Sequence, residues 1–463
     1  MNGAGRALLE DVTAKLPAGW RIATIGSCVA ELIGGASPSE KDYTDIGVLV
    51  LNKGDIKTYG KLSLKGSVKR TSPAFASKHA SKIISTRSLV VTLRDLSSKA
   101  DFLGLISLYE GTEAALITQG MYSILLNQDV LDRFLMYYSN APAYRTIVKR
   151  EKHGATQVHL RNGEFLSIPI PLAPISEQRR IVQRLDDVVE KVEACRARLI
   201  HVHQILTKFR EAVLQAAVLG KLTEEWRVEH GVSSPEKEVQ LEDVWKDSSY
   251  GSAAKSKSIG MIPVLRMGNI QNGALDWRDL VYTSDTNEIS KYKLQAGDVL
   301  FNRTNSPGLV GKTAVYHGER PAIYAGYLIR VRCGDRLHPD YLGCCLNSPA
   351  GRHYCWSVKT DGVSQSNINA SKLGAFSFLL PCVQEQVEIV RRVAELFSLV
   401  ETFQRRYDDA LTRLASLTPS VLAKAFRGEL VAQNPSDEPA GEMRLARNDQ
   451  QALSSRKTSH ARG

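Results

Sequence analysis

Residues 177–213 have the sequence EQRRIVQRLDDVVEKVEACRARLIHVHQILTKFREAV, and residues 385–421 have the sequence EQVEIVRRVAELFSLVETFQRRYDDALTRLASLTPSV. A shift of 208 positions overlays the two stretches, beginning with the Glu-Gln pairs at 177–178 and 385–386. Between 177 and 222 the shifted copies share 14 identities in 46 positions. Agreement at a fixed period indicates an internal repeat, so the chain consists of two related halves.

The repeated stretch has the apolar spacing of a long helix. In both copies, apolar residues recur at alternating intervals of four and three over more than four heptads, which predicts a coiled-coil seam. A homodimeric coiled coil would produce the same pattern, but two matching copies in one chain favour an intramolecular pair. The predicted seam includes Ile181, Leu185, Val188, Val192, Leu199, Leu206, Ile389, Val393, Leu396, Val400, Phe403 and Leu414.

Glycine and proline mark the predicted ends of these helices. Gly220 and Gly428 stand where each helical stretch should stop, since glycine readily adopts the left-handed conformation that ends a helix. Thr418-Pro419 is predicted to end the second long helix and start a short one, because proline fits best at the first helical position.

The segments that precede the helices have diverged from each other, and they contain short, β-rich apolar runs bounded by Gly, Asn, Asp and Ser. We therefore predict an α+β chain, with two α/β domains separated by a pair of long helices. The expected regions are a first domain (1–170), a central helical region (171–235), a second domain (236–380), a C-terminal helical region (381–432) and a polar, disordered tail (433–463).

Composition restricts the class of protein. The chain has 463 residues, a formal net charge of +11 and a pI near 9.2, and its 43% hydrophobic residues are typical of globular proteins. No apolar run approaches the ~18 residues of a membrane span, and the N-terminus lacks the apolar core of a signal peptide. Seven cysteines without a Cys-x-x-Cys pair favour a reducing cytoplasm over a disulfide framework or a zinc ribbon.

Positive charge is concentrated in the first diverged segment. Residues 53–99 hold eleven Lys and Arg against two acids, whereas residues 177–230 hold ten basic against nine acidic side chains. An excess of this kind favours contact with DNA phosphates, although a solvated basic face without a ligand would have the same composition. The candidate DNA-contacting residues here are Lys53, Lys57, Lys61, Lys65, Lys69 and Arg70.

The second diverged segment carries side chains of the kind that read bases. Arginine pairs with guanine and asparagine with adenine in the major groove, but both residues also occur in ordinary turns. The candidates are Arg266, Asn269, Asn302, Arg303, Asn305 and Lys312. A Gly-x-Thr/Ser-Gln loop also recurs ahead of each helix. Its Thr156, Gln157, Ser364 and Gln365 either contact DNA or cap the junction between domain and helix.

Motifs for catalysis and cofactor binding are missing from the sequence. Gly311-Lys312-Thr313 resembles the end of a P-loop, but position 306, where the first glycine belongs, is Ser. There is no Asn/Asp-Pro-Pro-Tyr/Phe run of an amino-methyltransferase, no HExxH, no Gly-x-Ser-x-Gly and no Cys/His set at zinc spacing. We therefore predict no catalytic residue, metal or cofactor in this chain. A nuclease with scattered carboxylates would leave no such motif and stays an alternative.

Several short segments carry a family resemblance. They are LPAGW (16–20), the Pro-rich 169–174 before Glu177-Gln178, FREAVL (209–214), GKLTEEW (220–226) and LAKAFRGEL (422–430). Together with the repeated helices they resemble the specificity (S) subunit of type I restriction-modification systems, with most similarity to the type IA branch. The resemblance covers residues 16–432.

The resemblance implies a non-catalytic subunit with two target recognition domains, each reading one half of a split, asymmetric DNA sequence. Residues 17–170 and 240–380 would read the half-sites. The helices would pair antiparallel, set the unread spacer and dock two modification (M) subunits through 209–226 and 417–430. The M subunits would bind S-adenosylmethionine and methylate adenine N6, and two restriction (R) subunits would add translocation and cleavage with ATP and Mg.

Aligning the apolar runs sets Thr92-Leu93-Arg94-Asp95-Leu96 against Phe301-Asn302-Arg303-Thr304-Asn305, which implies different half-sites. The alternative function is a coiled-coil DNA-binding regulator or scaffold that acts without modification subunits.

Overall fold

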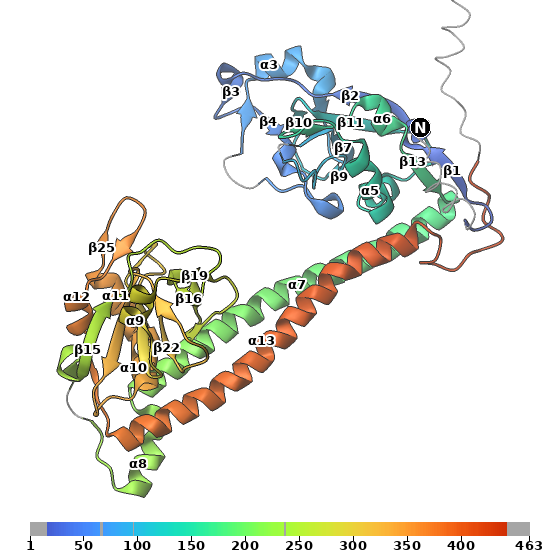
Figure 1. Ribbon diagram of the computed structural model, residues 1–463. Helices are drawn as coiled ribbons and strands as arrows, with labels where there is room; N and C mark the ends of the chain where they lie inside the picture. The colour runs from blue at the N-terminus through green and yellow to red at the C-terminus, as the bar shows by residue number, and fades with distance from the viewer. Residues whose placement is uncertain (1–15, 65–67, 96, 236–237, 442–463) are drawn as a thin grey trace, which may run out of the picture. The chain divides into compact units, whose positions relative to one another are not determined.

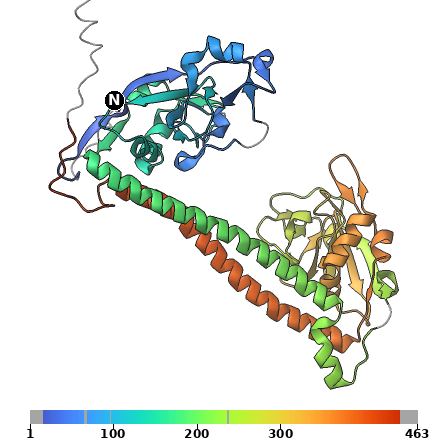
Figure 2. The same ribbon diagram turned by 180° about the vertical axis from the view of Figure 1, so that it is seen from behind.

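The computed structural model describes residues 16–64, 68–95, 97–235 and 238–441. It divides into two compact units, which are described separately (Figures 1 and 2). Unit 1 comprises Met1–Arg198 and Ala410–Gly463, and unit 2 comprises Leu199–Asp409. Each unit therefore contains one α/β domain and one end of each long helix, and both helices cross the boundary between the units.

The two predicted long helices are α7 (Ile175–Val218) and α13 (Val383–Ala425). Helix α7 ends two residues before Gly220 and α13 three residues before Gly428. Both glycines are left-handed, with φ of 67° and 73°, which confirms the predicted stops.

The predicted break at Thr418-Pro419 is wrong, because α13 continues through Pro419. A proline inside a helix removes one backbone hydrogen bond without preventing the helix from continuing. Beyond the proline, Leu422 and Phe426 are buried in the apolar core of unit 1, and this packing keeps the last turns helical.

The two helices are antiparallel in each unit. In unit 1 the first turns of α7 pack beside the last turns of α13, where Ile181 and Leu422 belong to one apolar core. In unit 2 the last turns of α7 pack beside the first turns of α13, where Ala217 and Ile389 share a second core. The prediction of an intramolecular helix pair is therefore confirmed.

The predicted seam is closely packed only near the domains. Its buried members are Ile181, Leu185, Val192, Ile389, Val393 and Val400, and its half-buried members are Val188, Leu199, Leu206, Leu396 and Leu414. Phe403 is 53% exposed, so its predicted burial is wrong. Near this position the helices meet through the stacked rings of His203 and Tyr407, 5.7 Å apart, and a polar ring pair does not require an apolar residue at every seam position.

The domain of unit 1 contains a four-stranded antiparallel sheet in the order β2 (Val29–Gly34), β11 (Met121–Leu126), β7 (Ser88–Thr92), β9 (Ile106–Tyr109). A mixed sheet has the order β3 (Tyr43–Thr44), β5 (Arg70–Thr71), β4 (Val48–Leu51), β10 (Ala115–Ile117), β6 (Ile83–Ile84). Two short pairs are β1 (Arg21–Thr24) with β13 (Pro169–Leu172) and β8 (Arg94–Asp95) with β12 (Val158–His159). The helices are α2 (Ile25–Cys28), α3 (Pro73–Lys78), α4 (Asp132–Tyr138), α5 (Pro142–Glu151) and α6 (Asn162–Leu166).

The domain of unit 2 contains a four-stranded sheet in the order β15 (Trp245–Tyr250), β24 (Leu328–Cys333), β20 (Asp298–Asn302), β22 (Thr313–Tyr316). Two three-stranded sheets have the orders β19 (Val281–Thr283), β16 (Ile262–Leu265), β23 (Ile323–Tyr324) and β21 (Thr304–Asn305), β26 (Ser366–Asn367), β25 (Thr360–Asp361). Two short pairs are β14 (Glu238–Gln240) with β27 (Ser377–Leu379) and β17 (Ile270–Gln271) with β18 (Ala274–Leu275). The helices are α8 (Glu224–His230), α9 (Thr286–Tyr292), α10 (Pro339–Asn347), α11 (Pro349–Val358) and α12 (Ala370–Gly374).

The two domains share one plan despite their divergent sequences. In both four-stranded sheets the first strand along the chain is at the edge, the last strand along the chain is next to it, and the remaining two follow. Both domains also contain one parallel strand pair, β4 with β10 and β16 with β23. Central strands such as β7 and β20 are rich in Val and Leu and are buried, as expected for sheet interiors. The predicted α+β architecture with an internal repeat is confirmed.

The tail predicted to be disordered from Gln433 is ordered as far as Gly441, and residues 442–463 lie outside the described part. The Gln433 side chain donates to the Glu177 carboxylate at 2.6 Å, and Asp437 forms an ion pair with Arg180 at 2.6 Å. The backbone of Ala440 donates to Gly19 at 2.9 Å. A polar segment is ordered here because its side chains and backbone find partners on unit 1.

Candidate nucleic-acid interface

A glutamine at the same position in each half of the chain hydrogen-bonds the domain to the start of its long helix. In unit 1 the Gln178 amide donates to the carbonyls of Asp129 and Ala173, both at 2.9 Å, and its oxygen accepts from the Leu131 N–H at 2.9 Å. Residues 129–131 belong to the domain, whereas residue 173 leads into α7. The side chain therefore joins a domain loop to the first turn of the helix.

The second glutamine makes the same three contacts in unit 2. The Gln386 amide donates to the carbonyls of Arg336 (2.9 Å) and Pro381 (2.8 Å), and its oxygen accepts from the His338 N–H at 2.7 Å. Gln178 and Gln386 are both fully buried. The identical pairs at 177–178 and 385–386 thus mark two equivalent junctions, a role that the sequence repeat alone did not reveal.

The neighbouring glutamates are also buried and paired. Glu177 accepts from the indole N–H of Trp20 at 2.8 Å and from Gln433. Glu385 accepts from the Thr223 hydroxyl at 2.7 Å and from the Arg227 guanidinium at 2.5 Å. Thr223 and Arg227 follow the end of α7, and Gln433 follows the end of α13. The glutamate in the first turns of each long helix is therefore hydrogen-bonded by the segment that follows the other helix.

Several of the predicted phosphate-contacting cations of unit 1 already have partners. The Arg70 guanidinium forms two hydrogen bonds of 2.8 Å with the Glu113 carboxylate, and these bonds hold the pKa of Glu113 below its ordinary value. Lys61 forms an ion pair with Glu193 at 2.8 Å, and Lys57 donates to the carbonyl of Gly54. Arg70, Lys61 and Lys57 therefore serve the domain's own structure.

The remaining cations of this set are available. Lys69 lies 5.1 Å from the centre of the Tyr43 ring. Neither Lys53 nor Lys69 has an acidic partner within 4 Å among the residues that the structure describes. Lys65 lies outside the described residues.

Two of the asparagines predicted to read bases are buried. Asn269 is 3% exposed, and its amide donates to the carbonyls of Asp276 and Asp279, both at 3.0 Å, which closes a turn. Asn302 is fully buried at the end of β20. The structure contradicts their prediction as base readers, because neither side chain can reach a base edge. Arg266, beside this turn, forms an ion pair with Asp279 at 3.3 Å.

Arg303 has the geometry expected of a recognition side chain. Its guanidinium lies 4.7 Å from the centre of the Tyr250 ring and donates to Gly326 (3.2 Å) and to the Asn367 side chain (3.3 Å). Tyr250 is 43% exposed, so the stacked pair lies at the domain surface. These contacts hold the arginine in one orientation and leave further N–H groups for a ligand. Asn305, two residues on, is half-buried, and its side chain accepts from the Ser306 N–H at 2.8 Å.

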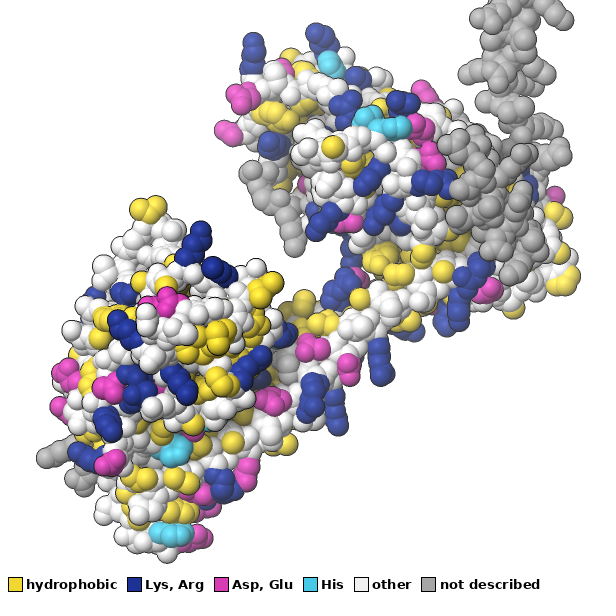
Figure 3. All heavy atoms as spheres, viewed as in Figure 1, with side chains coloured by type: hydrophobic (Ala, Val, Ile, Leu, Met, Phe, Trp, Pro, Cys, Tyr) yellow, Lys and Arg dark blue, Asp and Glu magenta, His cyan; other side chains and the backbone are white. Residues whose placement is uncertain are grey.

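Two further aromatic residues of this domain are exposed, although the sequence did not predict their exposure. Trp356 is 56% exposed, with the Lys359 ammonium 4.3 Å from its ring centre, and Tyr327 is 47% exposed. Tyr327 is also the backbone partner of Arg303, at 3.0 Å. Aromatic residues next to polar turns were the available signal, but the sequence does not show which aromatic side chains are exposed. Figure 3 shows Lys and Arg side chains on the visible face of both units.

Backbone partners place the two domains in register and correct the sequence alignment by one residue. Leu93 donates to the carbonyl of Gly120 at 2.8 Å, as Arg303 does to that of Tyr327. Leu160 donates to the carbonyl of Leu93 at 3.0 Å, as Ile368 does to that of Arg303 at 2.9 Å. Leu93 rather than Arg94 is therefore the counterpart of Arg303. Apolar strand residues contain no marker that fixes such a register from sequence.

The repeated Gly-x-Thr/Ser-Gln loops are hairpin tips. Thr156 and Gln157 lie between the paired residues His153 and His159. Ser364 and Gln365 lie between β26 and β25, and Figure 1 labels β25. All four residues are exposed. The junction hydrogen bonds described above are made by Gln178 and Gln386 rather than by these four side chains.

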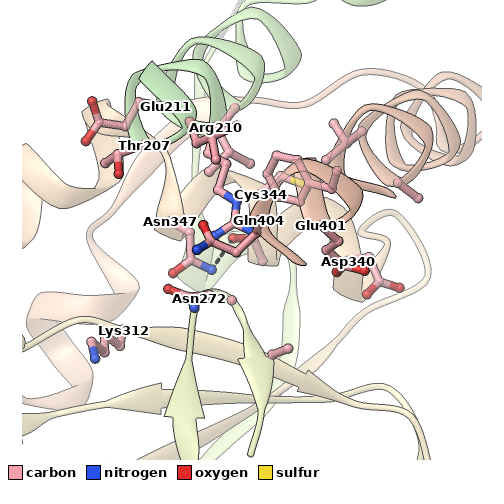
Figure 4. Close-up of a pocket in the computed structure, with 18 of the residues that line it drawn as sticks. Thr207, Arg210, Glu211, Asn272, Lys312, Asp340, Cys344, Asn347, Glu401 and Gln404 are labelled. Carbon is pink, nitrogen blue, oxygen red and sulfur yellow. Dashed lines mark hydrogen bonds between the residues drawn. The ribbon is translucent and has the colours of Figure 1, made fainter. Parts of the chain in front are cut away.

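Unit 2 also contains a cleft of 820 Å³ between its domain and the helices (Figure 4). Lys312 lies at its edge and donates to the Gln271 side chain at 3.0 Å; burial, and then the charge of Arg352, lower the pKa of its ammonium group. Figure 4 shows Arg210 of α7 and Gln404 of α13 extending into the cleft. Acidic residues, including Glu211 and Glu401, also line it, so its charge does not select an anion.

Known proteins share this arrangement. The sequence model of the type I restriction modification DNA specificity domain matches residues 17–203 and again residues 235–409. The chain belongs to this family. The specificity subunit of the EcoKI type I restriction enzyme of Escherichia coli K12 is 33% identical over 316 residues, which are 67% of this chain and 68% of that subunit. The StySPI specificity subunit of Salmonella potsdam is 33% identical over 312 residues, covering 66% of this chain and 67% of that subunit.

Solved structures show the same fold at lower identity. A chain from a structure of an assembled type I restriction-modification system superposes with a TM-score of 0.62 at 20% identity, covering 90% of this specificity-family chain and 100% of that chain. The HsdS subunit of Thermoanaerobacter tengcongensis superposes with a TM-score of 0.52 at 19% identity, covering 90% and 98%. Within residues 16–64, 68–95, 97–235 and 238–441, no cluster of His, Cys, Asp and Glu could hold a metal ion, and no helix is long and apolar enough to span a membrane.

Proposed function

We propose that this chain is the DNA specificity subunit of a type I restriction-modification complex, in which each α/β domain reads one half of a bipartite, asymmetric target. The observation that supports this most directly is the pair of equivalent junctions at Gln178 and Gln386, which join two domains of one fold but divergent sequence to the long helices. Leu93, which is buried in the core of the first domain, stands where the second domain has Arg303 stacked on the exposed Tyr250. One scaffold with different side chains at equivalent positions is what two different half-sites require.

We assign DNA contacts to side chains that are accessible to solvent and are not already paired with an acidic residue. We assign base contacts in the second half-site to Arg303 and its aromatic neighbours Tyr250 and Tyr327. Lys53 and Lys69 in the first domain are assigned to phosphates. Such contacts position the duplex without specifying its sequence.

The long helices would set the unread spacer and dock two M subunits. Both 209–226 and 417–430 include exposed apolar side chains: Phe209 is 41%, Leu219 46% and Leu417 44% exposed. Exposed apolar residues near the ends of both helices favour a protein partner. Since the two regions are copies of one repeat, two copies of the same partner would bind.

The remaining chemistry would belong to partner subunits in the cytoplasm. The M subunits would bind S-adenosylmethionine and methylate adenine N6, and R subunits, where present, would use ATP and Mg. This chain would contribute no catalytic residue. Assignment to the type IA branch stays a prediction.

Reconstitution tests this function. The purified chain alone should neither methylate nor cleave DNA, whereas the chain with its cognate M subunits should methylate adenine in a split sequence. If the chain alone bound a specific DNA sequence and adding M subunits produced no methylation, a regulator or scaffold would be favoured instead. Metal-dependent cleavage by the isolated chain would favour a nuclease.

A further inference from the structure

Each domain presents one exposed hairpin tip of nearly the same sequence. The tips are Gly154-Ala155-Thr156-Gln157 and Gly362-Val363-Ser364-Gln365. The first is closed at its base by two backbone hydrogen bonds of 2.9 Å between His153 and His159. The second is closed by the pairing of Thr360 with Asn367, and Val363 at its apex is fully exposed. Both tips are therefore held on short two-stranded stems.

The hydroxyl and amide groups of these tips are not used within the chain. Thr156, Gln157, Ser364 and Gln365 make no side-chain hydrogen bond to the residues that the structure describes. This distinguishes them from Asn269, Asn302 and Arg70, whose polar groups are buried or paired. The tips present donors and acceptors directly to solvent.

The likeness of the tips indicates what they can recognise. The two domains differ at the position of Arg303, where the first domain has the buried Leu93. A side chain that is the same in both domains cannot distinguish two different half-sites. It can, however, contact the part of DNA that all half-sites share, the sugar–phosphate backbone, to which hydroxyl and amide groups commonly donate.

The lysines near the stems make contacts within their own domain. Lys152 directly follows α5, and Lys359 directly follows α11, so each stem begins with a lysine. Lys152 donates to the carbonyl of Ser98 at 2.6 Å, and Lys359 pairs with Asp361 at 2.6 Å. A docking site for a protein would be expected to centre on aromatic and aliphatic side chains, which are few in these tips.

We propose that the two tips contact the DNA backbone in the same way at both half-sites and thereby position each domain on the duplex without reading bases. This inference rests on the proposed function. It assigns Thr156, Gln157, Ser364 and Gln365 to positioning, and it leaves base choice in the second half-site to the surface around Arg303.

The test uses the complex of the full chain with its M subunits. Two double variants, Thr156→Ala with Gln157→Ala and Ser364→Ala with Gln365→Ala, remove the polar groups of one tip each. A third variant exchanges residues 154–157 and 362–365. The matched control, Ser290→Ala with Gln295→Ala, removes exposed groups of the same kind elsewhere in the second domain. DNA affinity is measured by titration at fixed salt, and the methylated motif by sequencing.

Each double variant should weaken binding about tenfold on target and on unrelated DNA alike, the effect of losing hydrogen bonds to a charged phosphate. The methylated bases should not change, and the exchange variant and the control should behave as wild type. A changed motif in the alanine or exchange variants would show base reading and overturn the proposal. Unchanged DNA affinity, or loss of M-subunit binding alone, would also overturn it. If the wild-type complex methylates no split target, the proposed function itself fails.

Discussion

At the residue scale, Arg303 is held ready for a ligand by the Tyr250 ring and by two hydrogen bonds. Arg303→Ala should relax the second half-site and leave the first intact, because a bidentate arginine–base pair contributes about 1–3 kcal/mol of discrimination. Sequencing of methylated DNA measures both half-sites in one experiment. Arg320 also stacks at 4.7 Å, on Trp277 of the same domain, so Arg320→Ala is the control and should change neither half-site. Relaxation of the first half-site by Arg303→Ala would contradict the assignment.

The buried glutamines Gln178 and Gln386 allow a second prediction at this scale. Leucine at either position would leave two carbonyls and one N–H unpaired, at about 1–3 kcal/mol for each buried group. Gln178→Leu should therefore lower hydrogen-exchange protection in unit 1, and Gln386→Leu in unit 2. Gln183→Leu, an exposed change on the same helix as Gln178, should leave protection unchanged. Equal effects of Gln183→Leu and Gln178→Leu would show that the junction bonds do not stabilise the units.

From the sequence, the types of side chain that could bind DNA were easier to predict than which individual residues are exposed. Asn269, Asn302 and Arg303 are equally plausible base readers as residue types, but only Arg303 lies at the surface, because exposure depends on the tertiary fold. The Glu-Gln pairs were found as identities, yet their role needed the loops at 129–131 and 336–338, which are distant in sequence. Tyr250 and Trp356 were missed for the same reason.

At the scale of elements, α7 and α13 are the parts best predicted from sequence, because apolar spacing over many turns has a single structural explanation. The prediction failed at Pro419, where burial of the following turns outweighs the missing hydrogen bond. It also failed by one residue in aligning β7 with β20, since alternating apolar strand residues look alike after a shift.

The helices also support a prediction about distance. One heptad inserted after Arg198 in α7 and one after Asp409 in α13 would lengthen the antiparallel pair by about 10 Å, the rise of about three base pairs. The unread gap should then grow by whole base pairs, by at most about three, while both half-sites stay the same. The methylated motif of the insertion variant measures this. An unchanged gap in an active complex would show that the helices do not set the spacing.

At the scale of the whole molecule, each half of the repeat stabilises the start of the other half's long helix. Arg227, in the segment after α7, donates to Glu385 at the start of α13. In the same way Gln433, in the segment after α13, donates to Glu177 at the start of α7. Each α/β domain is thereby fixed to both helices, although the two domains share little sequence. This construction allows the domains to vary while the junctions stay the same, as a protein that reads two different half-sites requires.

The central claim is that two such domains read two separate DNA sequences at one fixed interval. Sequencing of N6-methyladenine in DNA from cells that contain this chain and its M subunits tests this directly. The account predicts methylation within two short, different blocks of specified bases, separated by a constant number of unspecified ones. One uninterrupted block, a variable gap, or no chain-dependent methylation would contradict it.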